Sequence, residues 1–234
     1  MESLELLANN LANASTAGFK ADRERYMTYW AAESTSALDA GRGGPGVSPV
    51  IEKNWIDFTQ GALTRTGVPT HVAFTGPGFL SFQRGGETLF TRNGELQISA
   101  QGVLVNGDGS PVLSDNPNNP LIRLDPALSV EIAPDGEVSQ AGQAIGRIRL
   151  VNFAQPQSLQ KAGHNAFRWT GPPQDIGPAP AASLMQGALE SANSGPAEGA
   201  VRMVNVLRQF ESLQKALQLG SEMNKRLIDE VAKV

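Results

Sequence analysis

The chain has 234 residues, of which 18% are charged, and a formal net charge of −4. This balance, without a dense run of Lys and Arg, argues against nucleic acid as a partner. The absence of cysteine excludes disulfides and thiolate metal sites. The 25 Gly and 15 Pro favour a turn-rich β protein. No apolar run is long enough to span a bilayer and the N-terminus lacks the pattern of a cleavable signal peptide, so we expect no membrane insertion.

The first predicted element is a short helix from Ser3 to about Asn13, where apolar residues recur at helical spacing. The residues from Asn13 to Gly18 suit the end of a helix. We assign residues 1–30 to the N-terminal helix and motif of an inner helical domain. Residues 31–50, with a glycine-rich run at 41–46, are predicted to be a flexible loop. No Gly-Lys-Ser/Thr follows that run, so a phosphate-binding loop is excluded.

Residues 51–170 are predicted to form a β-rich antiparallel central domain, because short apolar runs alternate with turn residues about every ten positions. The pair Asn93-Gly94 is typical of a tight primed hairpin turn, since both residue types tolerate positive φ. The candidate strands are 72–74, 79–82, 89–91, 96–98, 103–105, 112–113, 129–132 and 145–153.

The Pro-rich residues that follow indicate a linker and return segment over 171–199, in which 184–190 come back alongside the start of the chain. Residues 200–234 are predicted to be one long helix of the inner helical domain. Its apolar residues return at alternating steps of three and four, which is a heptad pattern. Gly220 and Asn224 occupy two of the heptad positions, and a polar residue such as Asn224 fixes the register of paired helices.

The expected fold class is therefore mixed α and β, with a β-rich antiparallel central domain and N- and C-terminal helices that pair into a coiled-coil-like α domain. One alternative is that the long helix packs on the core of its own domain; the other is that the termini pair with the termini of other copies. We expect Asn10 and Asn13 to cap the first helix or to bridge to another chain. The predicted assembly interface comprises Leu4, Leu7, Asn10, Leu11, Asn13, Met203, Val206, Phe210, Leu213, Leu217, Asn224, Leu227 and Val231.

Residues with catalytic or metal-binding chemistry are few. His71 and His164 are the only histidines, and neither has the spacing of a metal ligand or lies beside a candidate nucleophile. The acidic residues mostly fall in predicted turns, where Asp has a backbone hydrogen-bonding role. We therefore predict no catalytic residues, no metal and no cofactor. A β-rich binding module, such as an adhesin or a carbohydrate binder, remains the alternative function.

Several motifs resemble the signatures of the flagellar basal-body rod and hook proteins, over nearly the whole chain. The proximal-rod members are the most similar, and the distal-rod members come second. Family members carry a longer segment before Asn9-Asn10, so a short first helix is expected here. The matching stretches are Ala8 to Asn13 with Thr16, Gly18, Phe19 and Lys20; Asp57 to Leu63; Gly76 to Phe79; Phe90 to Gly94; Gly102; Pro134 to Gly136; Gln186 to Ser191 with Asn193; and Arg208, Phe210 and Glu211.

This resemblance implies a non-enzymatic structural subunit of the flagellar rod, a drive shaft across the periplasm that serves motility. The implied partners are other rod subunits, copies of the chain itself and the flagellar export apparatus, which would export it without a cleavable signal peptide. The terminal helices are implied to form the inner layer of a helical tube, with the β domain facing outward. Because the helices offer little surface to each other in a monomer, we expect disordered ends and a protease-resistant core of about Ile51 to Trp169.

Overall fold

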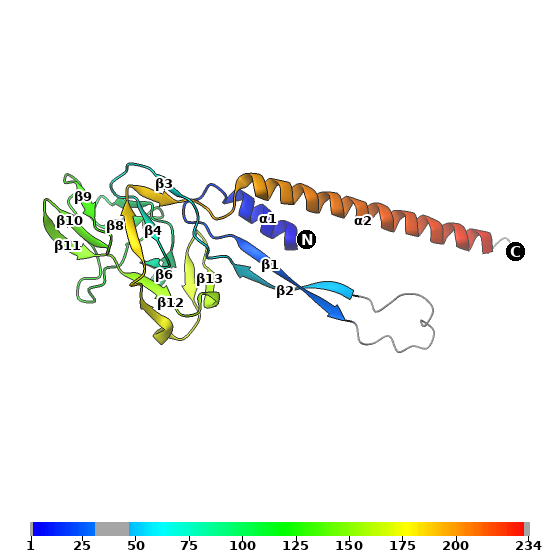
Figure 1. Ribbon diagram of the computed structural model, residues 1–234, viewed down its shortest axis with the longest axis horizontal. Helices are drawn as coiled ribbons and strands as arrows, with labels where there is room; N and C mark the ends of the chain where they lie inside the picture. The colour runs from blue at the N-terminus through cyan, green and yellow to red at the C-terminus, as the bar shows by residue number, and fades with distance from the viewer. Residues whose placement is uncertain (1, 31–46, 232–234) are drawn as a thin grey trace.

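The computed structural model describes residues 2–30 and 47–231, which form two α-helices and a set of antiparallel strands (Figure 1). Helix α1 spans Glu2–Ala12 and helix α2 spans Pro196–Val231. Two short 3-10 helices, η1 at Pro156–Ser158 and η2 at Pro173–Asp175, lie between strands. The strands are β1 Asp22–Trp30, β2 Val47–Ile56, β3 Leu63–Arg65, β4 Val72–Thr75, β5 Phe79–Arg84, β6 Glu87–Thr91, β7 Leu96–Ile98, β8 Leu104–Asn106, β9 Val130–Ile132, β10 Glu137–Gln140, β11 Gln143–Arg147, β12 Leu150–Phe153, β13 Leu159–Lys161, β14 Phe167–Trp169, β15 Ile176–Pro178, β16 Ser183–Gln186 and β17 Ala188–Glu190.

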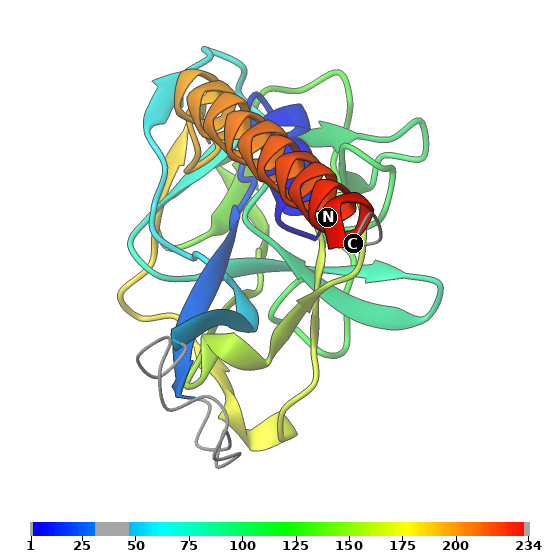
Figure 2. The ribbon, with the colours of Figure 1, turned by 90° about the vertical axis from the view of Figure 1, so that its right-hand side faces the viewer.

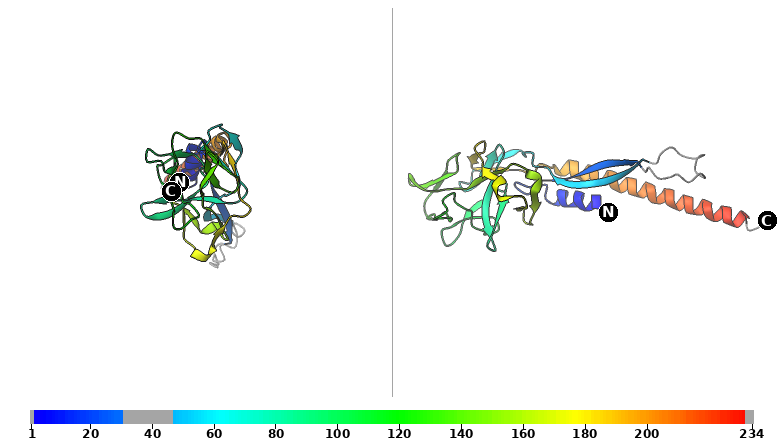
Figure 3. Two further views of the ribbon diagram at one scale, coloured as in Figure 1. Left: turned by 90° about the vertical axis from the view of Figure 1, so that its left-hand side faces the viewer. Right: turned by 90° about the horizontal axis from the view of Figure 1, so that it is seen from below.

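Three elements project from the same side of the strand-rich body: α1, α2 and the two-stranded ribbon of β1 and β2 (Figure 1). We call the body formed by β3 to β17 the β region and the β1–β2 pair the ribbon. Seen from below, the ribbon runs alongside α1 and the first part of α2, and α2 continues well beyond the end of α1 (Figure 3). The molecule is therefore elongated, with both chain ends on one side.

The ribbon was not predicted from the sequence. Strand β1 pairs with β2 in antiparallel register from Asp22 opposite Ile56 to Trp30 opposite Val47, with a shift between Arg25 and Tyr26. Residues 47–50, expected in a loop, therefore belong to β2, and the rest of the expected loop, 31–46, lies outside the described residues. The second strand was missed because the glycine-rich run at 41–46 directly precedes β2 and led to the assignment of residues 31–50 as a loop.

Two large apolar clusters form most of the core of the β region, and a small third one contains Phe82, Leu89 and Ala166. Its six-stranded sheet has the order β13-β14-β6-β5-β12-β15, and smaller sheets pair β11-β10-β9, β16-β4, β17-β3 and β7-β8. Phe79, Phe90, Phe153 and Phe167 pack edge to face on the six-stranded sheet. The larger cluster, which includes Val72, Phe74, Leu80, Leu96, Leu104 and Ile148, joins that sheet to the smaller ones. The fold is thus β-rich and antiparallel with two helices, as the sequence predicts in its coarse outline.

The return segment is part of the β region. Strand β15 pairs with β12, β16 pairs with β4, and β17 pairs with β3, all antiparallel. The backbone hydrogen bonds of these short strands are made with strands that are distant in the sequence. Their local sequence carries no strand pattern of its own, which is why it was interpreted as a linker. Helix α2 begins at Pro196, four positions before the predicted start, because proline at a first helical turn loses no hydrogen bond.

Two local predictions are wrong. Asn93-Gly94 is not a hairpin turn: β6 pairs with β5 and β14, β7 pairs with β8, and neither residue has positive φ. Gly94 is needed for another reason, since a Cβ atom there would lie 1.7 Å from the carbonyl oxygen of Val72. The strand expected over 145–153 is two strands, β11 and β12, which belong to different sheets.

Candidate assembly surface and its junction with the β region

Helix α1 packs against the first turns of α2, as the views of Figure 1 and Figure 2 both show. The side chain of Leu11 lies over Gly199, where an added Cβ would be 3.5 Å from Leu11 Cδ1. The leucine, methionine and valine side chains that are half-buried on the two helices are Leu4, Leu6, Leu7, Leu11, Met203 and Val206. The predicted interface residues of α1 therefore lie against those in the first turns of α2. The two helices do not form a coiled coil along the whole length of α2.

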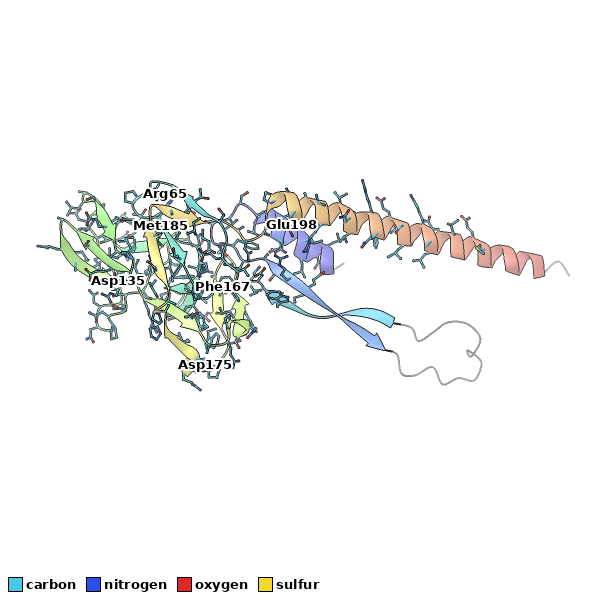
Figure 4. The ribbon with its side chains drawn as sticks, in the orientation of Figure 1. Arg65, Asp135, Phe167, Asp175, Met185 and Glu198 are labelled. Atoms are coloured by element: carbon cyan, nitrogen blue, oxygen red, sulfur yellow. The ribbon has the colours of Figure 1, made fainter. Side chains whose placement is uncertain are left out.

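The continuation of this stripe on α2 is uncovered. Phe210, Leu213 and Leu217 are 45%, 63% and 74% exposed. They follow Met203 and Val206 at heptad spacing and so lie on the same side of the helix. Figure 4 shows that α2 starts near Glu198 and continues well past the end of α1. We call Met203, Val206, Phe210, Leu213 and Leu217 the seam.

The last three predicted interface residues lie near the end of α2. The helix backbone includes Asn224, Leu227 and Val231, but their side chains lie outside what the structure describes. A second group of exposed apolar residues, Val201, Val204 and Leu207, lies off the seam on the early turns of α2.

The two asparagines of the predicted interface have different places. Asn10 is buried, and its Nδ2 donates to the Asp22 carbonyl at 2.8 Å while its Oδ1 accepts from the Asp22 N–H at 3.0 Å. This pair of bonds ties α1 to the start of the ribbon. Asn13 lies just after α1; its Nδ2 donates to the Asn9 carbonyl at 2.9 Å, and its Oδ1 accepts from the Thr16 hydroxyl. Both amides are therefore bonded within the chain.

A buried cluster of charges lies where the two chain ends meet the β region. The Nζ of Lys20 donates to Glu190 Oε1 at 2.6 Å, and Arg92 Nη2 lies 2.7 Å from Glu190 Oε2. The side chains of Lys20 and Glu190 are completely buried, and that of Arg92 nearly so. We call Lys20, Arg92 and Glu190 the junction. Each comes from a different part of the chain: the segment after α1, the segment after β6, and β17.

The pKa values of two groups at or next to the junction, Lys20 and Asp57, are shifted by their surroundings. Burial, opposed by the hydrogen bond and charge of Glu190, lowers the pKa of the Lys20 ammonium below its usual value. For Asp57 burial acts to raise the pKa, but hydrogen bonds from Thr59 and from Arg23 outweigh it, so the pKa of this carboxyl is lowered. Asp57 is thus held as a carboxylate that orders the end of the ribbon.

Asn193 adds a second tie next to the junction. Its Nδ2 donates to the Asp57 carbonyl at 2.6 Å, and its Oδ1 accepts from the Ala21 N–H at 2.9 Å. The segment leading into α2 is therefore bonded both to the end of the ribbon and to the start of the chain. The backbone of Glu190 adds to this, because its carbonyl accepts from the Gly18 N–H at 2.6 Å.

Sequence reasoning named these junction residues only as parts of motifs and did not include them in the predicted interface. Lys20 and Glu190 look like ordinary surface charges in a sequence, since such residues are rarely fully buried unless paired. The available signal was that Lys20, Arg92 and Glu190 each fall inside a signature motif. Their common location required the tertiary structure.

No catalytic constellation emerges among the described residues. A cleft of about 1060 Å³ lies between the ribbon and the η1–β13 segment, but its charged groups already have partners. Asp22 pairs with Lys161 at 2.7 Å, and Asp57 with Arg23 at 3.0 Å. Within residues 2–30 and 47–231, no group of three His, Cys, Asp or Glu is placed to hold a metal ion. Neither described helix is long and apolar enough to cross a bilayer.

Comparison with known proteins gives consistent matches along the chain. Residues 73–140 match the family described as flagellar hook protein FlgE/F/G D1 domain, and residues 185–230 match flagellar basal body rod FlgEFG protein C-terminal. The flagellar basal-body rod protein FlgF of Caulobacter vibrioides is 33% identical, with 99% of this chain and 92% of the relative covered. FlgG of Buchnera aphidicola subsp. Schizaphis graminum is 32% identical, with 96% and 92% covered, and FlgG of Bacillus subtilis is 30% identical, with 97% and 92% covered.

These matches include both terminal signatures and the β region, and the relatives are rod proteins with a structural role. An adhesin or carbohydrate-binding function finds no support among them. The chain therefore belongs to the family of flagellar basal-body rod proteins, and it is a structural subunit of the rod and not an enzyme.

Proposed function

We propose that this subunit is built into a helical tube in which α1 and α2 form the inner layer and the β region faces outward. Its partners in that tube are copies of itself and related rod subunits. In the same proposal the rod spans the periplasm as a drive shaft, and the subunit reaches it through the flagellar export apparatus. The division of the chain into an inner helical domain, a central domain and connecting segments remains part of this prediction.

The observation that carries the proposal is that the seam is uncovered from Phe210 to Leu217. Helix α1 has 11 residues and covers roughly 16 Å, whereas the 36 residues of α2 extend for roughly 54 Å. Phe210, Leu213 and Leu217 are exposed along this uncovered part. Burying each side chain is favourable by about 1.5–3 kcal/mol, so a neighbouring helix on the seam stabilises both molecules.

More than one neighbour is expected for the early part of α2. Val201 and Val204 are exposed on a different side of the helix from the seam. A subunit in the wall of a tube has neighbouring subunits on several sides. Apolar groups on two sides of α2 fit such a position better than they fit a contact with a single second chain. In the same proposal Asn224, Leu227 and Val231 continue the contact surface to the end of α2, and Asn224 fixes its register.

The test is a charge placed on the seam. Phe210→Asp brings a carboxylate into the proposed interface, where its desolvation is unfavourable without a partner, so we expect loss of swimming and of rods in purified basal bodies. Ser212→Asp is the matched control, because it adds the same charge at an exposed position that lies off the seam and beyond the early turns of α2 that carry Val201 and Val204. Thermal unfolding of the β region should be the same in both variants. Normal swimming by the Phe210→Asp strain would contradict the proposal.

A further inference from the structure

We infer that Glu190, with Lys20 and Arg92, positions both chain ends against the β region and thereby sets the direction in which α1 and α2 leave it. The inference rests on the proposed function only in that this direction matters for building a tube. The positioning itself is a property of the single subunit.

Glu190 collects hydrogen-bond donors from three segments that are distant in sequence. Its Oε1 accepts from Lys20 Nζ and from the Gly61 N–H at 2.9 Å, and its Oε2 accepts from Arg92 Nε at 2.9 Å. A carboxylate that is bonded on both oxygens has few orientations in which all partners are satisfied. Glu190 thus holds the segment after α1, the segment after the ribbon and the segment after β6 in one arrangement.

Arg92 is the fixed part of the junction. Its Nη1 donates to the carbonyls of Gly76 and Gly78 at 2.8 and 2.9 Å, and its guanidinium lies over the Phe74 ring, 4.9 Å from the centroid. These contacts bind Arg92 to the interior of the β region. Glu190 therefore has one anchor that does not depend on the N-terminal segment.

Lys20 is the part that belongs to the N-terminal segment. Besides Glu190, its Nζ donates to the Thr59 carbonyl at 2.6 Å. Displacing this segment would leave a charged ammonium without partners or would expose a completely buried site to water. Either result is unfavourable, so the ion pair disfavours other orientations of the segment.

Glycines allow the segments to touch through their backbones. At Gly18, which has a φ of 65°, a Cβ would lie 2.4 Å from the carbonyl carbon of Arg92. At Gly61, a Cβ would lie 2.0 Å from the carbonyl oxygen of Ser191. The segments are therefore in direct contact, which leaves no flexible side chain between them to absorb a change of angle.

The helix–helix contact by itself is less specific. The apolar side chains between α1 and α2 are only half-buried, and apolar contacts have no directional requirement. The charged junction is completely buried and directional. We therefore attribute the orientation of the chain ends to the junction, whereas the apolar contact between α1 and α2 adds stability.

The experiment measures distances between spin labels in the full-length subunit. Because the chain has no cysteine, introduced cysteines are the only labelling sites. Ser15 reports on the N-terminal segment and Gly195 on the segment before α2, each paired with Leu128 in the β region; Thr88 with Leu128 serves as the reference pair. All four positions are exposed, and a Cβ at Gly195 meets no atom within 4 Å. The unsubstituted junction should give one narrow distance distribution for each pair.

Two junction variants have different expected results. Glu190→Gln keeps the shape of the side chain but removes its charge, so the distributions from Ser15 and Gly195 should both lose their single narrow peak. Lys20→Met should broaden the distribution from Ser15 only, because Glu190 keeps Arg92 and the Gly61 N–H. The control Arg147→Gln breaks exposed ion pairs with Asp135 and Glu137. It should leave the distance distributions of all three label pairs unchanged.

The inference is overturned if Glu190→Gln leaves both peaks narrow, or if it broadens the Thr88 reference pair equally, since the residue would then support the β region as a whole. Equal broadening of both end labels by Lys20→Met would overturn it too. These measurements use the single subunit, so their failure is distinguishable from failure of the assembly proposal, which the swimming test addresses.

Discussion

Lys20 and Glu190 are 170 positions apart in the chain, and the Nζ of the first donates a 2.6 Å hydrogen bond to the Oε1 of the second. Both side chains are completely buried. The contact closes the chain on itself just before α1 and α2 leave the β region. The ends of the subunit are therefore joined by an ion pair inside the protein, before any neighbour contributes.

Glu190→Gln should lower the free energy of unfolding by about 3–5 kcal/mol, because it leaves the buried charges of Lys20 and Arg92 without their anionic partner. Urea unfolding at neutral pH measures the change. Arg147→Gln is the control, since exposed pairs contribute about 0–1 kcal/mol. Equal effects of the two substitutions would show that burial of the Lys20 pair has no energetic consequence.

Asp57→Asn should make the free energy of unfolding depend less on pH in the acidic range. The pKa of Asp57 is lowered in the folded subunit, so the folded state binds this proton less readily than the unfolded state, whose Asp pKa is about 3.9. The stabilisation is present above that unfolded pKa and is lost as the pH falls through the lower folded pKa. The difference in unfolding free energy between the wild type and the variant should therefore be largest near neutral pH and shrink below about pH 4.

Urea unfolding over this pH range checks that prediction. Asp135→Asn, at an exposed ion pair with Arg147, should change the unfolding free energy by less than about 1 kcal/mol. A difference between Asp57→Asn and the wild type that stays constant from neutral to acid pH would contradict the assignment.

Gly94→Ala should destabilise the β region by more than about 2 kcal/mol, because the new Cβ would meet the Val72 carbonyl oxygen and force the backbone to move. Gly107→Ala is the matched control. A Cβ there meets only the Glu95 carbonyl oxygen at 4.0 Å, and Gly107 does not have positive φ. Thermal unfolding of the two variants gives the comparison; a tolerated Gly94→Ala would mean that the contact with Val72 adapts without cost.

Limited proteolysis of dilute subunit should remove the part of α2 beyond Val206, whose exposed apolar residues have no described partner in the monomer. The resistant core should extend past Trp169 to about Val206, because β16 and β17 pair with β4 and β3, Asn193 is bonded to Asp57, and α1 packs on the first turns of α2. This moves the C-terminal limit expected from the sequence. Mass spectrometry locates the end of the fragment, and full protection of α2 in dilute solution would contradict the coupling of helix order to assembly.

The sequence by itself indicated the features that depend on neighbouring residues. The heptad from Met203 to Leu217, the helical spacing from Leu4 to Leu11 and the six short strands β4 to β9 follow from local periodicity. The signature motifs likewise indicated the family. These signals are carried by residues a few positions apart, so they can be recognised without knowledge of the fold.

Only the tertiary structure decided which residues meet. Lys20 and Glu190 become a buried pair because β17 returns to β3 beside the N-terminal segment, and no local pattern states that pairing. Gly94 has a glycine's role at a close approach to Val72 and not in a turn, since β6 and β7 belong to different sheets. Burial and backbone contact arise between segments that are far apart in the chain. For that reason the sequence contains all three junction residues but does not show that they meet.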